Sequence, residues 1–134
     1  MDLNPECYVD TSALIAFLDR ADSYHPVYVR LFSAPPKLVT SALVIAEGHG
    51  WFLRKNGVRR AAQFLVFIKS LKPLIILPFG PEQVETAQPL LAKFGDQALT
   101  LADAHGLAIM RARKIKTCWS TDRHLSLMGA HLPQ

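Results

Sequence analysis

Two aspartates in this sequence follow short apolar segments, in places where parallel strands would end. Asp10 comes directly after Cys7-Tyr8-Val9, and Asp122 comes shortly after Thr117-Cys118-Trp119. Each has hydroxyl residues beside it: Thr11 and Ser12, and Ser120 and Thr121. In open α/β sheets, ligands bind in the crevice at the carboxyl ends of the strands. We therefore expect Asp10 and Asp122 to lie at one ligand-binding edge.

A third acid, Glu47, stands in an otherwise uncharged stretch. It is the only charged residue between Thr40 and Arg54. Its helical neighbours are apolar or small: Leu43, Val44, Gly50 and Trp51. This pattern predicts a largely buried carboxylate, which has to be paired with an arginine, protonated or bound to a cation. Gly48 and Gly50 weaken a helix, so we expect them to permit a close approach by another backbone or a ligand.

Asp103 is the fourth acid, at the start of a predicted helix. It follows Thr100 at the spacing of a capping box, so helix capping alone is one interpretation. Its neighbours on the helix surface are Gly106, Leu107 and Met110, which places it on the apolar face, toward the sheet. Asp96, in the turn before this helix, is either a simple turn residue or an accessory acid.

These acids suit a divalent cation. Carboxylates about 5 Å apart repel each other by roughly 3 kcal/mol per pair at an effective dielectric near 20, so a cluster needs positive charge. Ligands that are all oxygen favour Mg²⁺ or Mn²⁺, and no Cys/His spacing resembles a zinc site. Such metals activate a water and stabilise the leaving oxygen in phosphoryl transfer. The neighbouring hydroxyls would hold a water or a phosphate oxygen; they belong to Thr11, Ser12, Ser120 and Thr121.

Other chemistries at Asp10 fit less well. A phosphatase with a nucleophilic Asp10, of the haloacid dehalogenase pattern, requires a second Asp two residues later, where this chain has Ser12. A phospho-receiver module requires an acidic pair before the phosphorylated Asp. His105 and His124 each lie two residues beyond a candidate Asp and would point away from it on a helix, so we interpret them as surface or core residues.

The elements that position these acids alternate between strand and helix. We expect strands at 6–10, 38–40, 74–77 and 115–119. Helices are expected at 12–19 (capped by Ser12), 24–33 (capped by Ser23), 41–56 (ended by Gly57), 58–71, 81–94 and 100–114, with a short helix after Asp122. This order predicts an α/β fold, a mainly parallel sheet with helices on both faces, in a single domain spanning residues 1–134.

Composition limits the class of protein. The chain has 134 residues and half of them are hydrophobic, which is enough for one core and argues against disorder. It has no apolar run long enough to span a membrane and no signal-peptide pattern at its start, so we expect a cytoplasmic protein with no membrane partner. Cys7 and Cys118 are expected to be reduced thiols in buried strands.

The net charge is +4, and the basic residues are clustered. Residues 54–72 contain six basic residues and no acid. These residues are Arg54, Lys55, Arg59, Arg60, Lys69 and Lys72, and a second group is Arg111, Arg113, Lys114 and Lys116. Such clusters suit a polyanion such as nucleic acid, although a solvated helix face would have the same composition.

The ordered motifs resemble the PIN-domain family, in particular VapC-type toxins of bacterial toxin–antitoxin pairs. The matching segments are Tyr8-Val9-Asp10-Thr11-Ser12-Ala13-Leu14, the isolated Glu47 after Thr40-Ser41, Asp96-x-x-Leu99-Thr100-x-x-Asp103-Ala104, and Ser120-Thr121-Asp122-Arg123-His124. Each motif alone is weak, whereas their order and spacing along nearly the whole chain are specific.

The resemblance implies a three-layer α/β/α fold and a Mg²⁺- or Mn²⁺-dependent ribonuclease. It implies catalytic and metal-binding roles for Asp10, Glu47, Asp103 and Asp122, with Asp96 as an accessory metal ligand. Substrate-binding roles fall on Thr11, Ser12, Thr121 and Arg123. It also implies an RNA substrate, a cognate antitoxin and a homodimer. Two alternatives remain open: a catalytically silent module that binds RNA or protein, and a housekeeping RNA-processing nuclease.

Overall fold

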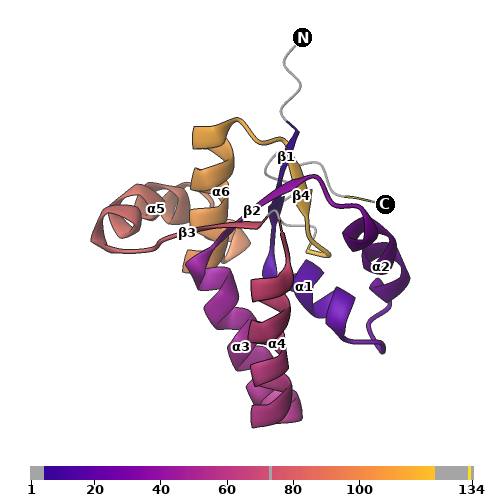
Figure 1. Cartoon of the computed structure of the whole chain (residues 1–134). Coiled ribbons are helices and arrows are strands. Elements are labelled where there is room, and N and C mark those ends of the chain that lie inside the picture. Colours follow the sequence, from indigo (N-terminus) through magenta and orange to yellow (C-terminus); the bar gives the residue numbers. More distant parts are fainter. Residues whose placement is uncertain (1–4, 73, 123–132, 134) are drawn as a thin grey trace.

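The fold is organised around a four-stranded parallel sheet, in a computed structural model that describes residues 5–72, 74–122 and 133. The strands are β1 (Glu6–Val9), β2 (Lys37–Ser41), β3 (Leu74–Leu77) and β4 (Thr117–Trp119), arranged in the order β3-β2-β1-β4. Tyr8 of β1 pairs with Val39 on one side and with Cys118 on the other. The first and last strands in the sequence therefore lie side by side, and Asp10 and Asp122 follow neighbouring strands (Figure 1).

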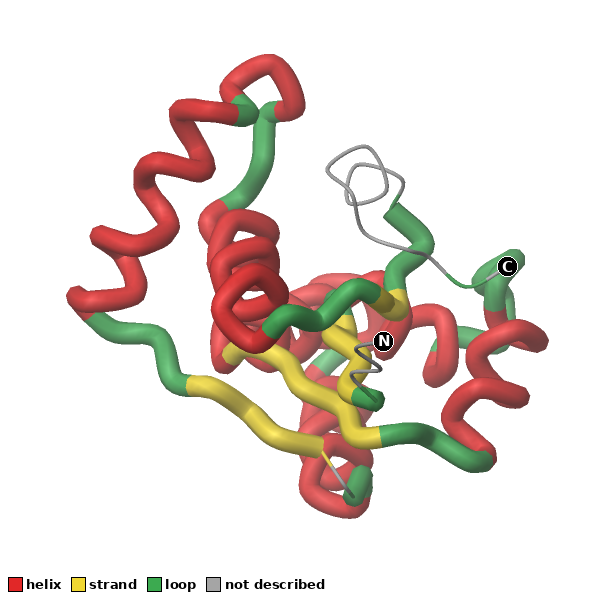
Figure 2. Tube along the Cα trace, turned by 90° about the horizontal axis from the view of Figure 1, so that it is seen from above, coloured by secondary structure: helices red, strands yellow, loops and turns green. Residues whose placement is uncertain are grey.

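Helices connect the strands and flank the sheet, as the sequence predicts (Figures 1 and 2). Three pairs pack against each other: α1 with α2, α3 with α4, and α5 with α6. The α3–α4 hairpin extends beyond the carboxyl edge of the sheet (Figure 1). The bounds are α1 (Thr11–Leu18), α2 (His25–Ser33), α3 (Ala42–Asn56), α4 (Val58–Ser70), α5 (Pro81–Lys93), a 3-10 turn η1 (Gly95–Gln97) and α6 (Leu101–Arg113).

Local side-chain chemistry explains several helix ends. The Ser41 hydroxyl caps α3 by accepting a hydrogen bond from the Leu43 N–H at 3.0 Å. Gly57 ends the same helix with a φ of 92°, a conformation that favours glycine. Two predicted caps are wrong. The residue that precedes α1 is Asp10 rather than Ser12, and Tyr24 rather than Ser23 precedes α2.

The core lies between the central strands and the helices. It includes Tyr8, Val9, Leu38 and Val39 from β1 and β2, together with aromatic residues from α2, α4 and β4. Cys118 is buried and Cys7 is partly buried, and both are free thiols, in agreement with the expectation. No helix in the described part of the chain is long and apolar enough to cross a membrane.

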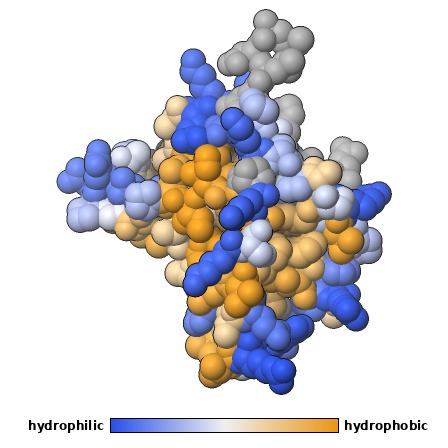
Figure 3. Space-filling view, in the orientation of Figure 1, coloured by the Kyte–Doolittle hydropathy of each residue, from blue (hydrophilic) through white to orange (hydrophobic). Residues whose placement is uncertain are grey.

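Apolar residues also reach the surface on the face drawn in Figure 3, where they gather over α6, β3 and α4. Ile75 and Ile76 of the edge strand β3 are exposed, and Val66 of α4 is two-thirds exposed. An exposed sheet edge with apolar side chains is a surface that another chain can cover.

Candidate active site

A cleft of about 450 Å³ opens where β1 and β4 end and where α1, α3 and α6 pass. All four acids that the sequence singled out contribute to its lining: Asp10, Glu47, Asp103 and Asp122. They come from four separate segments of the chain, so the tertiary fold brings them together at one cleft. This is the carboxyl edge of the sheet, where such folds bind ligands.

Asp10 is the buried member of this group, with 7% of its surface exposed. It precedes α1, but its side chain makes no capping hydrogen bond, so capping does not explain it. Burial, and next the negative charge of Asp103, raise the pKa of Asp10 to about 6 from its ordinary value of 3.8. An acid held in this way gains from a nearby cation, because positive charge favours its ionised form.

Two serine hydroxyls partly offset the cost of burying Asp10. Ser12 and Ser120 donate to its Oδ2 atom at 3.1 and 3.0 Å, which opposes the rise in pKa. The two Oγ atoms also lie 3.1 Å apart. Two hydroxyl protons cannot serve all three contacts at once, so both serines donate to Asp10 when it is ionised.

The same serines hold the segment that follows β4. The Thr121 N–H donates to Ser12 Oγ and the Asp122 N–H donates to Ser120 Oγ, each at 2.9 Å. We call Ser12 and Ser120 the serine pair. It links the carboxylate of Asp10 to the main chain that carries Asp122, so the two acids keep a defined relative position.

Glu47 lies at the cleft but is exposed, which corrects the expectation that it is buried. The α3 surface around it opens into the cleft, so its charge remains hydrated. Its Oε1 atom accepts a hydrogen bond of 2.7 Å from Thr11 Oγ1, which ties the start of α1 to α3. The Thr11 hydroxyl thus orients Glu47 in this structure.

Asp103 has both of the roles that the sequence left open. Its Oδ2 atom accepts from the Thr100 N–H at 3.0 Å, and its own N–H donates to Thr100 Oγ1 at 3.1 Å, forming a capping box. It is half-buried, lines the cleft and contributes to the raised pKa of Asp10. Capping fixes the carboxylate at the start of α6, and the fold directs it toward Asp10.

Two other predicted residues, Asp96 and Thr121, do not belong to the cleft lining that the described residues form. Asp96 is exposed in η1, where its Oδ2 accepts from Gln97 Nε2 at 3.3 Å. Thr121 contributes its main-chain N–H to the serine pair. Arg123, like His124 and the predicted helix after Asp122, lies outside the described residues. His105 is a buried core residue, whose Nδ1 lies 2.6 Å from Ser41 Oγ.

The donor set fits a hard divalent cation, although it does not form a closed cage. Within the described ranges, no three acid, His or Cys side chains lie close enough to hold a metal on their own. Mg²⁺ commonly keeps several waters and uses only one or two carboxylates directly. A cleft lined by four carboxylates, with the pKa of Asp10 raised by burial and next by the charge of Asp103, is compatible with that mode of binding.

The cleft has a second, less acidic part that the sequence pattern did not reveal. It is lined by Trp51 and Arg54 of α3 and by Ile15 of α1. In the sequence, Arg54 stands out only as one member of a basic cluster. The spacing in α3 does indicate this part of the cleft, because residues three and four apart share one helix face. The residues with this spacing are Glu47, Gly50, Trp51 and Arg54.

The sequence of residues 7–130 matches the PIN domain family. The chain belongs to the PIN-domain family. A search of curated proteins finds no match to this PIN domain. Among solved structures, it is similar to VapC20 of Mycobacterium tuberculosis, described as a toxin that cleaves the sarcin-ricin loop. The TM-score is 0.84 and the identity 25%, over 92% of this chain and 95% of that one.

Two more distant structures share the fold of this PIN domain. VapBC2 of Rickettsia felis, bound to a DNA fragment from its promoter, aligns with a TM-score of 0.64 and 13% identity, over 96% of this chain and 97% of that one. A toxin–antitoxin complex from Klebsiella pneumoniae aligns with a TM-score of 0.59 and 17% identity, over 87% of each chain. The predicted fold and the resemblance to VapC-type PIN domains are thereby confirmed.

Proposed function

We propose that this PIN domain is a metal-dependent endoribonuclease that hydrolyses phosphodiester bonds as the toxin of a VapBC-type pair. One observation carries the proposal: Asp10, Glu47, Asp103 and Asp122 line a single cleft at the carboxyl edge of the sheet. The activity of the similar toxin VapC20 supports RNA as the substrate. The proposal treats residues 1–134 as a single cytoplasmic domain.

Each residue has a defined task in this proposal. Asp10, Asp103 and Asp122 hold Mg²⁺ or Mn²⁺, and Glu47 completes the acidic group that orients the attacking water. When bound, such a metal lowers the pKa of water and stabilises charge on the leaving oxygen. The serine pair keeps Asp10 ionised and in place, Thr11 orients Glu47, and Thr121 and Arg123 contact the substrate. Asp96 is proposed only as an accessory acid outside the cleft.

The decisive experiment is cleavage of RNA by purified protein with Mg²⁺ or Mn²⁺. We expect cleavage that leaves 5′-phosphate ends, no cleavage in EDTA, and a loss of about a hundredfold or more in Asp10→Ala and Asp103→Ala, since each removes a carboxylate that would hold the metal. Glu47→Gln should lower the cleavage rate by more than any loss of folding stability explains. Undiminished cleavage by Asp10→Ala would point to a contaminating nuclease.

We further propose an antitoxin and a second copy of the chain as partners. Two of the similar structures are toxin–antitoxin complexes. The exposed apolar residues of β3 and α4 supply a surface suited to protein contacts. Light scattering on the purified protein should give the mass of two chains, and a monomer at every concentration would contradict the homodimer.

A further inference from the structure

The less acidic part of the cleft contains three kinds of side chain that together suit the binding of one nucleotide. Trp51 offers an aromatic ring, Arg54 a cation and Ile15 an apolar wall, and all three line the same cleft as the four acids. An acidic cluster alone explains none of them. From Glu47 to Arg54, one face of α3 spans about 10 Å, at about 1.5 Å per residue.

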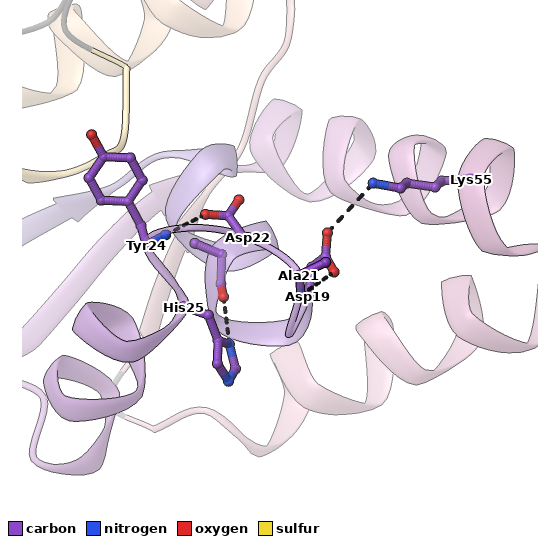
Figure 4. Close-up of polar contacts among 7 residues, drawn as sticks. Asp19, Ala21, Asp22, Tyr24, His25 and Lys55 are labelled. Atoms are coloured by element: carbon purple, nitrogen blue, oxygen red, sulfur yellow. Dashed lines mark hydrogen bonds and ion pairs between the residues drawn. The ribbon is translucent and has the colours of Figure 1, made fainter.

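Trp51 is held in a defined position. Its ring meets the buried Phe52 ring edge-on, with centroids 4.9 Å apart. Lys55 Nζ lies 4.6 Å from the centroid of the Trp51 indole. The same Nζ atom lies 3.6 Å from Asp19 Oδ2 (Figure 4). The Lys55 side chain is more than half exposed, so it can leave the ring face at little cost when another group stacks there.

Gly50 makes room for the cation beside the ring. A Cβ atom at Gly50 would lie 3.0 Å from Arg54 Nη1, which shows that the guanidinium lies back along α3 over this glycine. Arg54 is exposed and lines the cleft. A planar guanidinium with several donors suits a phosphate.

We propose that this part of the cleft is a nucleotide subsite, in which one base of a single-stranded RNA stacks on Trp51 and an adjacent phosphate binds Arg54. The proposal rests on the proposed nuclease function and adds how the strand is held beside the acids. Base–aromatic stacking tolerates any base, so this subsite holds an unpaired nucleotide without reading its identity.

Tryptophan fluorescence tests the base site directly. The chain has two tryptophans, and Trp119 is 4% exposed in the core, so a ligand-dependent change reports on Trp51. The probe is a short single-stranded oligoadenylate, added in EDTA to prevent metal-dependent hydrolysis. The matched ligand is a ribose–phosphate oligomer of the same length without bases. We expect the oligoadenylate to quench Trp51 fluorescence and the base-free oligomer to leave it unchanged.

Variants test the contributions of the Trp51 ring and the Arg54 charge separately. Binding is measured by the anisotropy of end-labelled ligands. Trp51→Leu should weaken oligoadenylate binding by about tenfold or more and leave binding of the base-free oligomer unchanged. Trp51→Phe should keep most of the affinity while abolishing the fluorescence response. Arg54→Gln should weaken both ligands. Ser70→Ala, which removes an exposed hydroxyl of α4 outside the cleft lining, is the control and should bind as the wild type does.

The outcomes distinguish this proposal from the nuclease proposal. RNA cleavage without any Trp51 response, or with full oligoadenylate affinity in Trp51→Leu, overturns the base site alone and favours a protein side chain as the occupant. Trp51 quenching in a protein that never cleaves RNA supports the base site and overturns the nuclease. If the protein shows neither Trp51 quenching nor RNA cleavage, both the base site and the nuclease proposal are overturned.

Discussion

At the residue scale, Asp10 is held where its ionised form is disfavoured. It is nearly buried, it faces the charge of Asp103, and its pKa is raised to about 6. Between the ordinary pKa and the raised one, Asp10 therefore binds more protons in the metal-free native protein than in the unfolded chain. The contribution of Asp10 to the unfolding free energy has to fall as the pH rises through that window.

The pH dependence of stability tests this property. In EDTA, we expect Asp10→Asn to remove the fall and to be more stable than the wild type by about 3 kcal/mol near pH 7, from about two pKa units at 1.36 kcal/mol each. Urea unfolding of both proteins from about pH 4 to about pH 7, which spans the window, gives the difference. His105 is present in both proteins, so its contribution cancels in the difference between their unfolding free energies. Burial lowers the pKa of His105, and its effect on the pH dependence has the opposite sign. Parallel pH profiles for the two proteins would contradict the burial effect.

The serine pair is a positioning device, and its test is a variant with a matched control. Ser120→Ala removes a donor to Asp10 and the acceptor of the Asp122 N–H. We expect Mn²⁺ affinity and kcat to fall by about tenfold to a hundredfold, with little change in KM for RNA, measured by metal titration and cleavage kinetics. Ser70→Ala, which removes an exposed hydroxyl bonded to the Phe67 carbonyl, should change neither. Equal effects in the two variants would exclude a positioning role.

At the scale of elements, α3 carries Glu47, Trp51 and Arg54, and its packing on α4 sets their direction. The Phe64 ring of α4 occupies the space that a Gly48 side chain would need, so a Cβ there would clash with Phe64 Cζ. Phe64 is almost fully buried and cannot move aside. The absence of a side chain at Gly48 therefore leaves room for the Phe64 ring of α4, while Gly50 faces Arg54 at the cleft.

The two glycines should respond differently to alanine. Gly48→Ala should destabilise the protein by about 1–3 kcal/mol through overpacking. Gly50→Ala meets only the flexible end of Arg54 and gains helix propensity, so its stability should stay equal or rise by up to about 1 kcal/mol. Urea unfolding of both variants measures the contrast. Similar losses in both would show that the α3–α4 contact is not the cause.

At the scale of the whole molecule, the sheet brings four distant acids to one cleft. A ligand that binds only the native state stabilises it by about 2.7 kcal/mol at a hundred times its Kd, so the proposed cation would couple its binding to folding. Burial, and next the charge of Asp103, raise the pKa of Asp10, and a cation in the cleft would oppose that rise.

We therefore expect Mn²⁺ to raise the Tm of the wild type and to leave that of Asp10→Asn nearly unchanged. Glu85→Gln is the control, since Glu85 is exposed on α5 outside the cleft lining, and its Tm shift should match the wild type. Thermal unfolding with and without Mn²⁺ measures all three proteins. No shift in the wild type would favour a catalytically silent binding module.

The sequence by itself determined the order of strands and helices, the parallel sheet and the four acids. These follow from local signals: apolar periodicity, the Ser41 and Thr100 caps, Gly57, and the acids' positions relative to the strand ends. Because parallel strands end at one edge, convergence of the acids was predictable without coordinates. The tertiary structure was needed to show that Glu47 is exposed and that the serine pair joins Asp10 to the Asp122 segment. Those facts depend on contacts between segments up to 110 residues apart, which no local pattern encodes.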